Sequence, residues 1–172
     1  MDVEVIFPAL ISDLAQRVVA ENARLGRKIA TAESCTGGLV SAALTEVAGS
    51  SAVFEYGFAT YANAAKSALL GVDPAILESF GAVSIETVRA MAVGAVRVSG
   101  ADAAVAISGI AGPGGGSSAK PVGTVVFALA QKGQLEKDVT AIRKDFGSDR
   151  SRAAIRGAAA AYALELLLPP AA

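Results

Sequence analysis

The residues best suited to chemistry lie in the segment 31–38, Thr31-Ala32-Glu33-Ser34-Cys35-Thr36-Gly37-Gly38. An apolar stretch precedes this segment and a helical pattern of apolar residues follows it, so it is predicted to join a strand to a helix. Free backbone N–H groups at a helix start, together with the helix dipole, favour bound negative charge. The segment is therefore either a site with a nucleophile, or the commoner arrangement in which Ser34 or Thr36 caps the helix.

The sequence contains no histidine. This excludes Ser-His-Asp and Cys-His catalysis, and also the usual histidine-bearing zinc sites. Acid–base chemistry would fall to Lys, Glu, Asp, Tyr or the single cysteine, Cys35. One cysteine allows neither an intramolecular disulfide nor a cysteine-only metal cage. We therefore expect no metal and no cofactor.

Lys66 is a second candidate, because it lies a little more than one helical turn after Tyr61 in a segment with no other charge. A lysine removed from water has a lowered pKa and can act as a general base. The commoner alternative is a surface lysine whose aliphatic stem lies over an alanine-rich helix. Cys35 would be a thiolate nucleophile only with an activated sulfur, so we interpret it as a small buried residue.

Two further groups have features of a phosphate site. The glycine-rich segment 109–118 could cradle a phosphate with its amides, but its spacing fits neither a Walker loop nor a dinucleotide fingerprint. A flexible connection is the simpler interpretation. Arg152 and Arg156 lie four residues apart, on one face of a predicted helix. They either clamp a phosphate or carboxylate, or form a solvated stripe paired with Asp145 and Asp149, and the residues alone favour neither.

The elements that must position these groups follow from apolar periodicity, caps and glycine stops. Helices are predicted at 8–25 (with Leu10, Leu14 and Val18 facing inward), from the segment 31–38 to about 49, and at 61–71, 73–80, 84–100 and 150–168. Strands are predicted at 28–32, 51–60, 103–108, 122–130 and 135–143, the last two as a hairpin. This order predicts a three-layer α/β/α sandwich with a mixed, mainly parallel sheet. Ligands gather beyond the carboxyl ends of such strands, which here are followed by 31–38, 60–66 and 108–116.

The composition gives broader expectations. The 172 residues are predicted to form a single domain, 1–172, and hydrophobic residues make up 53% of them, with a mean hydropathy of +0.50. No apolar run reaches the roughly 18 residues of a membrane span, and the N-terminus carries acids where a secretory signal needs bases. We expect a cytoplasmic protein without a membrane partner. The net charge of −1 gives no attraction to nucleic acid. So apolar a chain is expected to hide surface in a homo-oligomer, a dimer or higher.

Taken together, several ordered motifs resemble the C-terminal domain family of the competence/damage-inducible protein CinA, which includes nicotinamide-mononucleotide amidases of the PncC type. The resemblance covers about residues 10–168, in a form without the larger N-terminal domain that often precedes this one. The matching stretches are Ala32-Glu33-Ser34-Cys35-Thr36-Gly37-Gly38, Tyr61-Ala62-Asn63-Ala64-Ala65-Lys66 with Leu69-Leu70-Gly71-Val72, Ser108-Gly109-Ile110-Ala111-Gly112-Pro113-Gly114-Gly115-Gly116, Pro121-Val122-Gly123-Thr124-Val125 and Arg152-Ala153-Ala154-Ile155-Arg156.

The resemblance implies hydrolysis of the carboxamide of nicotinamide mononucleotide to the acid and ammonia, in NAD salvage, through a serine–lysine mechanism. It implies Ser34 as the nucleophile and Lys66 as its base, with amides beside Ser34 as the oxyanion hole and with Tyr61 and Ser108 orienting Lys66 or the substrate amide. The alternative is a nucleotide-binding or regulatory module that turns nothing over. The glycine-rich loop and Arg152 or Arg156 would hold the phosphate or ribose. Arg150 and Arg152 both fit the first arginine of the family's C-terminal pair, and the four-residue spacing to Arg156 favours Arg152. The expected substrate-binding residues are Glu33, Cys35, Thr36, Gly37, Asn63, Ser108, Gly109, Gly112, Gly114, Gly115, Arg152 and Arg156.

Overall fold

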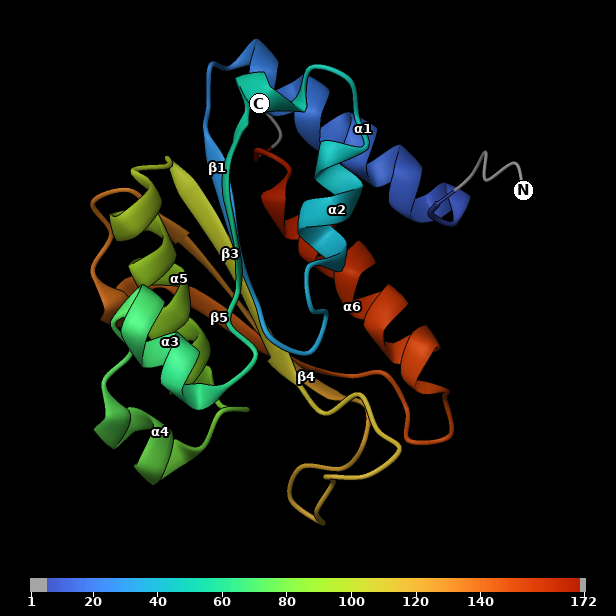
Figure 1. Cartoon of the computed structure of the whole chain (residues 1–172), viewed down its shortest axis with the longest axis vertical. Coiled ribbons are helices and arrows are strands. Elements are labelled where there is room, and N and C mark those ends of the chain that lie inside the picture. Colours follow the sequence, from blue (N-terminus) through green and yellow to red (C-terminus); the bar gives the residue numbers. More distant parts are fainter. Residues whose placement is uncertain (1–5, 171–172) are drawn as a thin grey trace.

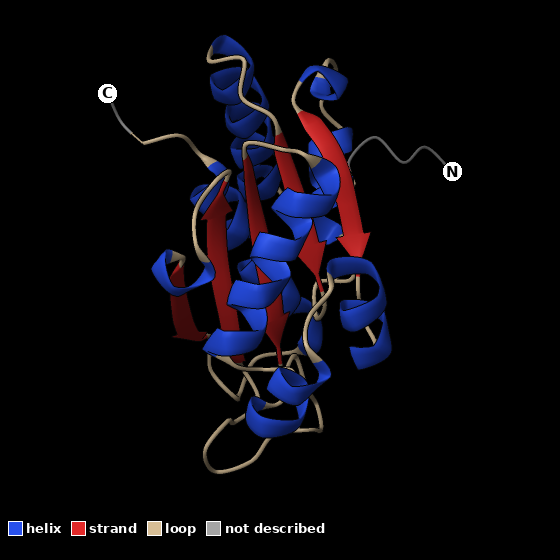
Figure 2. Cartoon of the chain, turned by 90° about the vertical axis from the view of Figure 1, so that its left-hand side faces the viewer, coloured by secondary structure: helices blue, strands red, loops and turns tan. Residues whose placement is uncertain are grey.

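The computed structural model describes residues 6–170 and contains a mixed sheet of five strands between two layers of helices (Figures 1 and 2). The helices are α1 (Ala9–Arg24), α2 (Leu39–Thr45), α3 (Asn63–Leu70), α4 (Pro74–Phe80), α5 (Ile85–Ser99) and α6 (Arg152–Leu167), with short 3₁₀ turns at Ser50–Ala52 and Glu136–Asp138. The strands are β1 (Ile29–Glu33), β2 (Phe54–Ala59), β3 (Ala103–Gly109), β4 (Thr124–Gln131) and β5 (Thr140–Asp145).

The strands lie in the order β2-β1-β3-β4-β5. β1 pairs in parallel with both β2 and β3, whereas β4 runs antiparallel to β3 and to β5. The carboxyl ends of β1, β2 and β3 therefore meet at one edge of the sheet, at the bottom of Figure 1. The predicted three-layer fold with a mixed, mainly parallel sheet is confirmed.

Two hydrophobic cores lie on opposite faces of this sheet. α1, α2 and α6 cover one face, and α3, α4 and α5 cover the other (Figure 1). Side chains of β1 and β3 are buried on both faces, as their continuous apolar sequences predict. We call these two layers the α6 layer and the α5 layer, after one helix of each that packs against the sheet.

Several local predictions are confirmed by the caps. Asp73 accepts from the amide of Ala75 at the start of α4, and Ser84 accepts from the amide of Thr87 at the start of α5. The predicted inward face of α1 is confirmed for Leu14 and Val18, which are buried, and wrong for Leu10, which is exposed; Ile11 and Asn22 are buried as well. Asn22 is buried because its amide donates to Val18 and to Leu167 at the end of α6, which satisfies an otherwise free helix-terminal carbonyl.

The predicted strand at 135–143 begins later than expected. A 3₁₀ turn at Glu136–Asp138 occupies its first part, so β5 starts at Thr140. β5 nevertheless pairs with β4 as an antiparallel neighbour, as the hairpin prediction requires. Within residues 6–170, the structure has no helix with the length and apolarity needed to cross a membrane.

α3 lies unusually close to α5. A Cβ atom on Gly94 of α5 would collide with the carbonyl oxygen of Leu70 at the end of α3. The same oxygen accepts from Nη2 of Arg97, 2.9 Å away. Glycine at position 94 therefore sets how deeply α3 packs, and α3 carries Lys66.

Candidate active site

The site begins where β1 ends. The backbone amide of Ser34 donates to the carbonyl of Ile107 at 2.9 Å, which extends the ladder between β1 and β3 by one residue. Because successive side chains of an extended chain point to opposite faces, Glu33 and Ser34 diverge. The carboxylate of Glu33 contacts α2 in the α6 layer, whereas the hydroxyl of Ser34 contacts Lys66 in the α5 layer.

Glu33 is fully buried, and its carboxylate holds the start of α2. It accepts from the amides of Gly38, Val40 and Ser41 at 3.0, 3.2 and 2.9 Å, and from the hydroxyl of Ser41 at 2.7 Å. A negative charge there is stabilised by these donors and by the positive end of the helix dipole. The structure thus shows Glu33 engaged with the chain itself, and the amides at this helix start are already used.

The tight turn after Ser34 leaves two backbone amides without an oxygen acceptor. The amide of Gly37 donates to the carbonyl of Ser34 at 3.1 Å, and Gly37 has a positive φ of 62°, which glycine adopts without strain. Within residues 6–170, the amides of Cys35 and Thr36 donate to no oxygen atom. They are the amides available for an oxyanion hole.

Lys66 comes from the first turns of α3 and is fully buried. Its Nζ lies 3.2 Å from Oγ of Ser34, 3.0 Å from the carbonyl oxygen of Thr60 and 3.1 Å from that of Tyr61. No salt bridge reaches it from the described part of the chain. Burial lowers its pKa, and only the nearby Cys35 opposes that shift. The alternative of a surface lysine is therefore wrong.

Cys35 is buried beside this pair. Burial raises the pKa of its thiol to about 11, although the amides of Cys35 and Thr36 and the Arg156 guanidinium lower it in part. At neutral pH the group is a thiol, a poor nucleophile. The interpretation of Cys35 as a small buried residue is confirmed. No cluster of metal-ligating side chains occurs within residues 6–170.

The arginines of α6 reach the site from the opposite layer. Arg156 donates from Nε to the carbonyl of Cys35 at 3.1 Å and from Nη2 to that of Thr36 at 2.8 Å. Arg152 donates to the carbonyl of Gly112 at 2.8 Å and to the Tyr61 hydroxyl at 3.2 Å. Neither forms an ion pair with Asp145 or Asp149 in the described chain, so the solvated-stripe alternative is wrong.

The other predicted residues divide into two groups. Ser108 is buried, and its hydroxyl donates to the carbonyl of Ala82 at 2.7 Å, while Gly109 lies against β4, where a Cβ would crowd Val125. Gly112 contacts Arg152. By contrast, Asn63, Gly114 and Gly115 are exposed, and none of the three forms a hydrogen bond with this cluster.

Sequence reasoning missed Thr60 and Ser41. Thr60 accepts from Lys66 through its carbonyl, and its position directly after a strand and before Tyr61 was the available signal. Ser41 supports Glu33 from one turn inside α2. The side-chain oxygens of Thr36 and Thr60 are buried without a hydrogen-bond partner among residues 6–170. Both residues lie in the two segments that meet at Ser34 and Lys66, and both hydroxyls are shielded from solvent.

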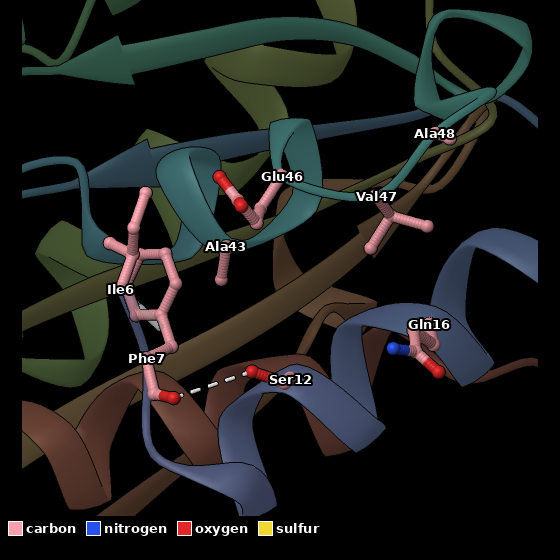
Figure 3. A pocket seen from close by; sticks show the side chains of 8 residues that line it. All are labelled: Ile6, Phe7, Ser12, Gln16, Ala43, Glu46, Val47 and Ala48. Carbon is pink, nitrogen blue, oxygen red and sulfur yellow. Dashed lines mark hydrogen bonds between the residues drawn. The ribbon is translucent and has the colours of Figure 1, made fainter. Parts of the chain in front are cut away.

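A separate groove of about 480 Å³ lies between α1 and α2 (Figure 3). Its lining includes Ser12, Gln16 and Glu46, and the Ser12 hydroxyl donates to the carbonyl of Phe7 at 3.5 Å. None of the predicted site residues lines it, and it offers no pairing of a nucleophile with a base. The candidate site is therefore the Ser34–Lys66 pair and its surroundings.

Comparisons with known proteins point the same way. The CinA C-terminal domain model matches residues 11–169. A protein of Enterobacter agglomerans named nicotinamide-nucleotide amidohydrolase PncC is 47% identical over 92% of this chain and 93% of its own length. The protein of the same name from Escherichia coli K12 is 51% identical over 83% of each chain. The crystal structure of the competence/damage inducible protein CihA from Agrobacterium tumefaciens has a TM-score of 0.90 and 48% identity, covering 95% of this chain and 96% of that one.

The match extends over the segments that carry Ser34, Lys66, the glycine-rich loop and the α6 arginines, and it includes both sequence and fold. The resemblance predicted from the motifs is confirmed: this chain belongs to the CinA C-terminal domain family.

Proposed function

We propose that this protein is a nicotinamide-nucleotide amidase that hydrolyses the carboxamide of nicotinamide mononucleotide to nicotinate mononucleotide and ammonia, through an acyl-enzyme on Ser34. The names of the Enterobacter and Escherichia relatives support the substrate and the reaction class. The observation that carries the mechanism is the 3.2 Å contact between Oγ of Ser34 and Nζ of the fully buried Lys66, which forms no salt bridge with any residue from 6 to 170.

The surroundings of Lys66 suit a proton carrier in both of its charge states. A neutral amine has two N–H donors and one lone pair. With both donors on the carbonyls of Thr60 and Tyr61, the lone pair faces the hydroxyl of Ser34. The ammonium has three donors for the same three oxygens. A proton therefore moves from Ser34 to Lys66 without rearrangement of the side chain.

The reaction follows in two stages. Ser34 Oγ attacks the carboxamide carbon while Lys66 takes the hydroxyl proton, and the amides of Cys35 and Thr36 stabilise the oxyanion. The C–N bond breaks as the Lys66 ammonium donates its proton to the departing ammonia. Water then attacks the ester, with Lys66 again as base, and the acid leaves as Ser34 regains its proton. The net reaction consumes one water for each amide.

The nucleotide part is held by groups around the same edge of the sheet. Arg152 and the loop at Gly112 provide a cation and a backbone cradle for the phosphate, and the Tyr61 side chain, 63% exposed, lies beside them.

The test is ammonia release from nicotinamide mononucleotide by purified protein pretreated with a chelator. The wild type is expected to turn over, and Ser34→Ala and Lys66→Ala to lose about 10⁴-fold or more in kcat while remaining folded. A variant that keeps most of the activity would remove that residue from the mechanism. Full occupancy by the nucleotide in calorimetry with no product from the wild type would instead favour the non-catalytic binding module.

A further inference from the structure

The oxyanion amides are held by contacts on the far side of their own peptide units. A trans peptide is planar, so its C=O and N–H point in opposite directions. The amide of Cys35 shares its peptide with the carbonyl of Ser34, which accepts from Gly37 at 3.1 Å. The amide of Thr36 shares its peptide with the carbonyl of Cys35, which accepts from Nε of Arg156 at 3.1 Å.

Arg156 grips this turn at a second point. Its Nη2 donates to the carbonyl of Thr36 at 2.8 Å, so its planar guanidinium spans two successive peptide units. A guanidinium is suited to this role because it is always charged and its donors are fixed in a rigid fork. Glu33 holds the other end of the turn through the amides of Gly38, Val40 and Ser41.

We propose that Arg156 is a positioning residue for the oxyanion hole, and that Arg152 is the arginine that binds the substrate phosphate. By fixing the Cys35 carbonyl, Arg156 aims the Thr36 N–H into the site. Its charge also polarises that peptide and strengthens the N–H as a donor to a developing negative charge. This inference rests on the proposed function, since an oxyanion forms only if an acyl transfer takes place.

The two arginines differ in what they leave free. Arg156 is partly buried, and its Nε and Nη2 donate to carbonyls within the turn that carries Ser34. Arg152 is exposed, and it lies between the glycine-rich loop and the tyrosine hydroxyl. A phosphate on the substrate therefore meets Arg152 at the surface, whereas the reacting carbon lies over the turn that Arg156 holds.

The experiment compares Arg156→Met, Arg156→Lys and Arg152→Met on nicotinamide mononucleotide and on nicotinamide riboside, which lacks the phosphate. Arg156→Met is expected to lower kcat about 100-fold on both substrates with little change in KM, because a misplaced donor affects the transition state. Arg156→Lys should recover part of that loss. Arg152→Met should raise KM for the phosphorylated substrate by a much larger factor than for the riboside.

An increase in KM confined to the phosphorylated substrate in Arg156→Met, with kcat unchanged, would overturn the inference and make Arg156 the phosphate ligand. Amide resonances provide a readout independent of turnover. In ¹⁵N spectra, the Thr36 signal should shift and lose rigidity in Arg156→Met but not in Arg152→Met. An inactive wild type would refute the proposed function, and an unchanged Thr36 signal would refute the positioning role, so the two failures are distinguishable.

Discussion

Each helical layer contributes one cationic side chain that contacts the segment from Ser34 to Thr36, and the surroundings of the two cations differ. Lys66, from the α5 layer, is fully buried, and its neighbours are a hydroxyl and two neutral carbonyls. Arg156, from the α6 layer, is only partly buried and grips two carbonyls of the turn itself. The proposed proton carrier, Lys66, is thus shielded from solvent and forms no salt bridge within residues 6–170. The proposed positioning residue, Arg156, keeps contact with solvent and with backbone dipoles.

The largest expected effect comes from replacing the buried Lys66 by arginine, which tests whether Lys66 and Arg156 have different roles. Lys66→Arg keeps the charge but cannot lose a proton at accessible pH, so kcat is expected to fall by about 10³-fold or more. Arg156→Lys, the reverse exchange in the other layer, serves as the matched control and should cost far less. Circular dichroism of both variants checks their folding. Comparable losses at the two positions would contradict the division of roles.

The pH dependence of kcat/KM should also distinguish Lys66 from Arg156, with a smaller expected change in activity. Because burial lowers the pKa of Lys66 from 10.5, the neutral base is present above that lowered value and is lost as the pH falls through it. kcat/KM should therefore fall about tenfold per pH unit below the Lys66 pKa and reach a plateau above it. The profile is measured above pH 7, where the phosphate no longer titrates. Arg156→Lys should lower the curve without moving its midpoint.

Unfolding measurements give a still smaller and independent effect. A lysine whose pKa is lowered by folding binds a proton more tightly in the unfolded chain, so it destabilises the fold at neutral pH. This cost disappears as the pH rises from the lowered folded value towards 10.5. The free energy of unfolding of the wild type, relative to Lys66→Met, should rise by about 1.4 kcal/mol for each unit of pKa depression. Denaturant titrations at pH 7 and 10 measure it, and parallel curves would contradict the desolvation of Lys66.

The smallest expected effect concerns Cys35, which lies near Lys66 and whose carbonyl accepts from Arg156. With its thiol pKa raised to about 11 by burial, the thiolate is nearly absent at pH 7.5. Iodoacetamide should leave the activity of the native protein unchanged and should label the cysteine only after unfolding. Mass spectrometry of both samples reads this directly. Rapid loss of activity with stoichiometric labelling would make Cys35 a reactive group in place of Ser34.

Much of this organisation follows from local sequence, and the failures have physical causes. Short-range rules predicted the order of elements, the caps at Asp73 and Ser84 and the helix ends at Gly71 and Gly100. From that order, the strand ends that meet at the site were predicted correctly. The burial of Lys66 was not readable from its own helix, because it depends on α5 and the sheet. The inward face of α1 was set by its packing on α6, which places Asn22 rather than Leu10 inside.

Glu33, next to Ser34, illustrates a second limit of prediction from sequence. Its motif attached Glu33 to the substrate, yet the strand's alternation directs it to α2, away from Lys66. That outcome depends on which residue ends the strand, and sequence patterns locate strand ends only within a few residues. A shift of one residue would exchange the directions of Glu33 and Ser34. The sequence therefore predicted that Glu33 belongs to the segment around Ser34, but not which element its carboxylate contacts.

The close contact between Gly94 and Leu70 has a consequence for protein engineering. Position 94 contributes no atom to the site, yet any larger residue there would displace α3 and move Lys66 away from Ser34. α3 and α5 therefore behave as one exchangeable module. A chimera that takes the lysine-bearing helix from one homologue should take its partner helix from the same parent. Grafting the Ser34–Lys66 pair onto another scaffold likewise requires a glycine where the neighbouring helix packs against the helix that carries the lysine.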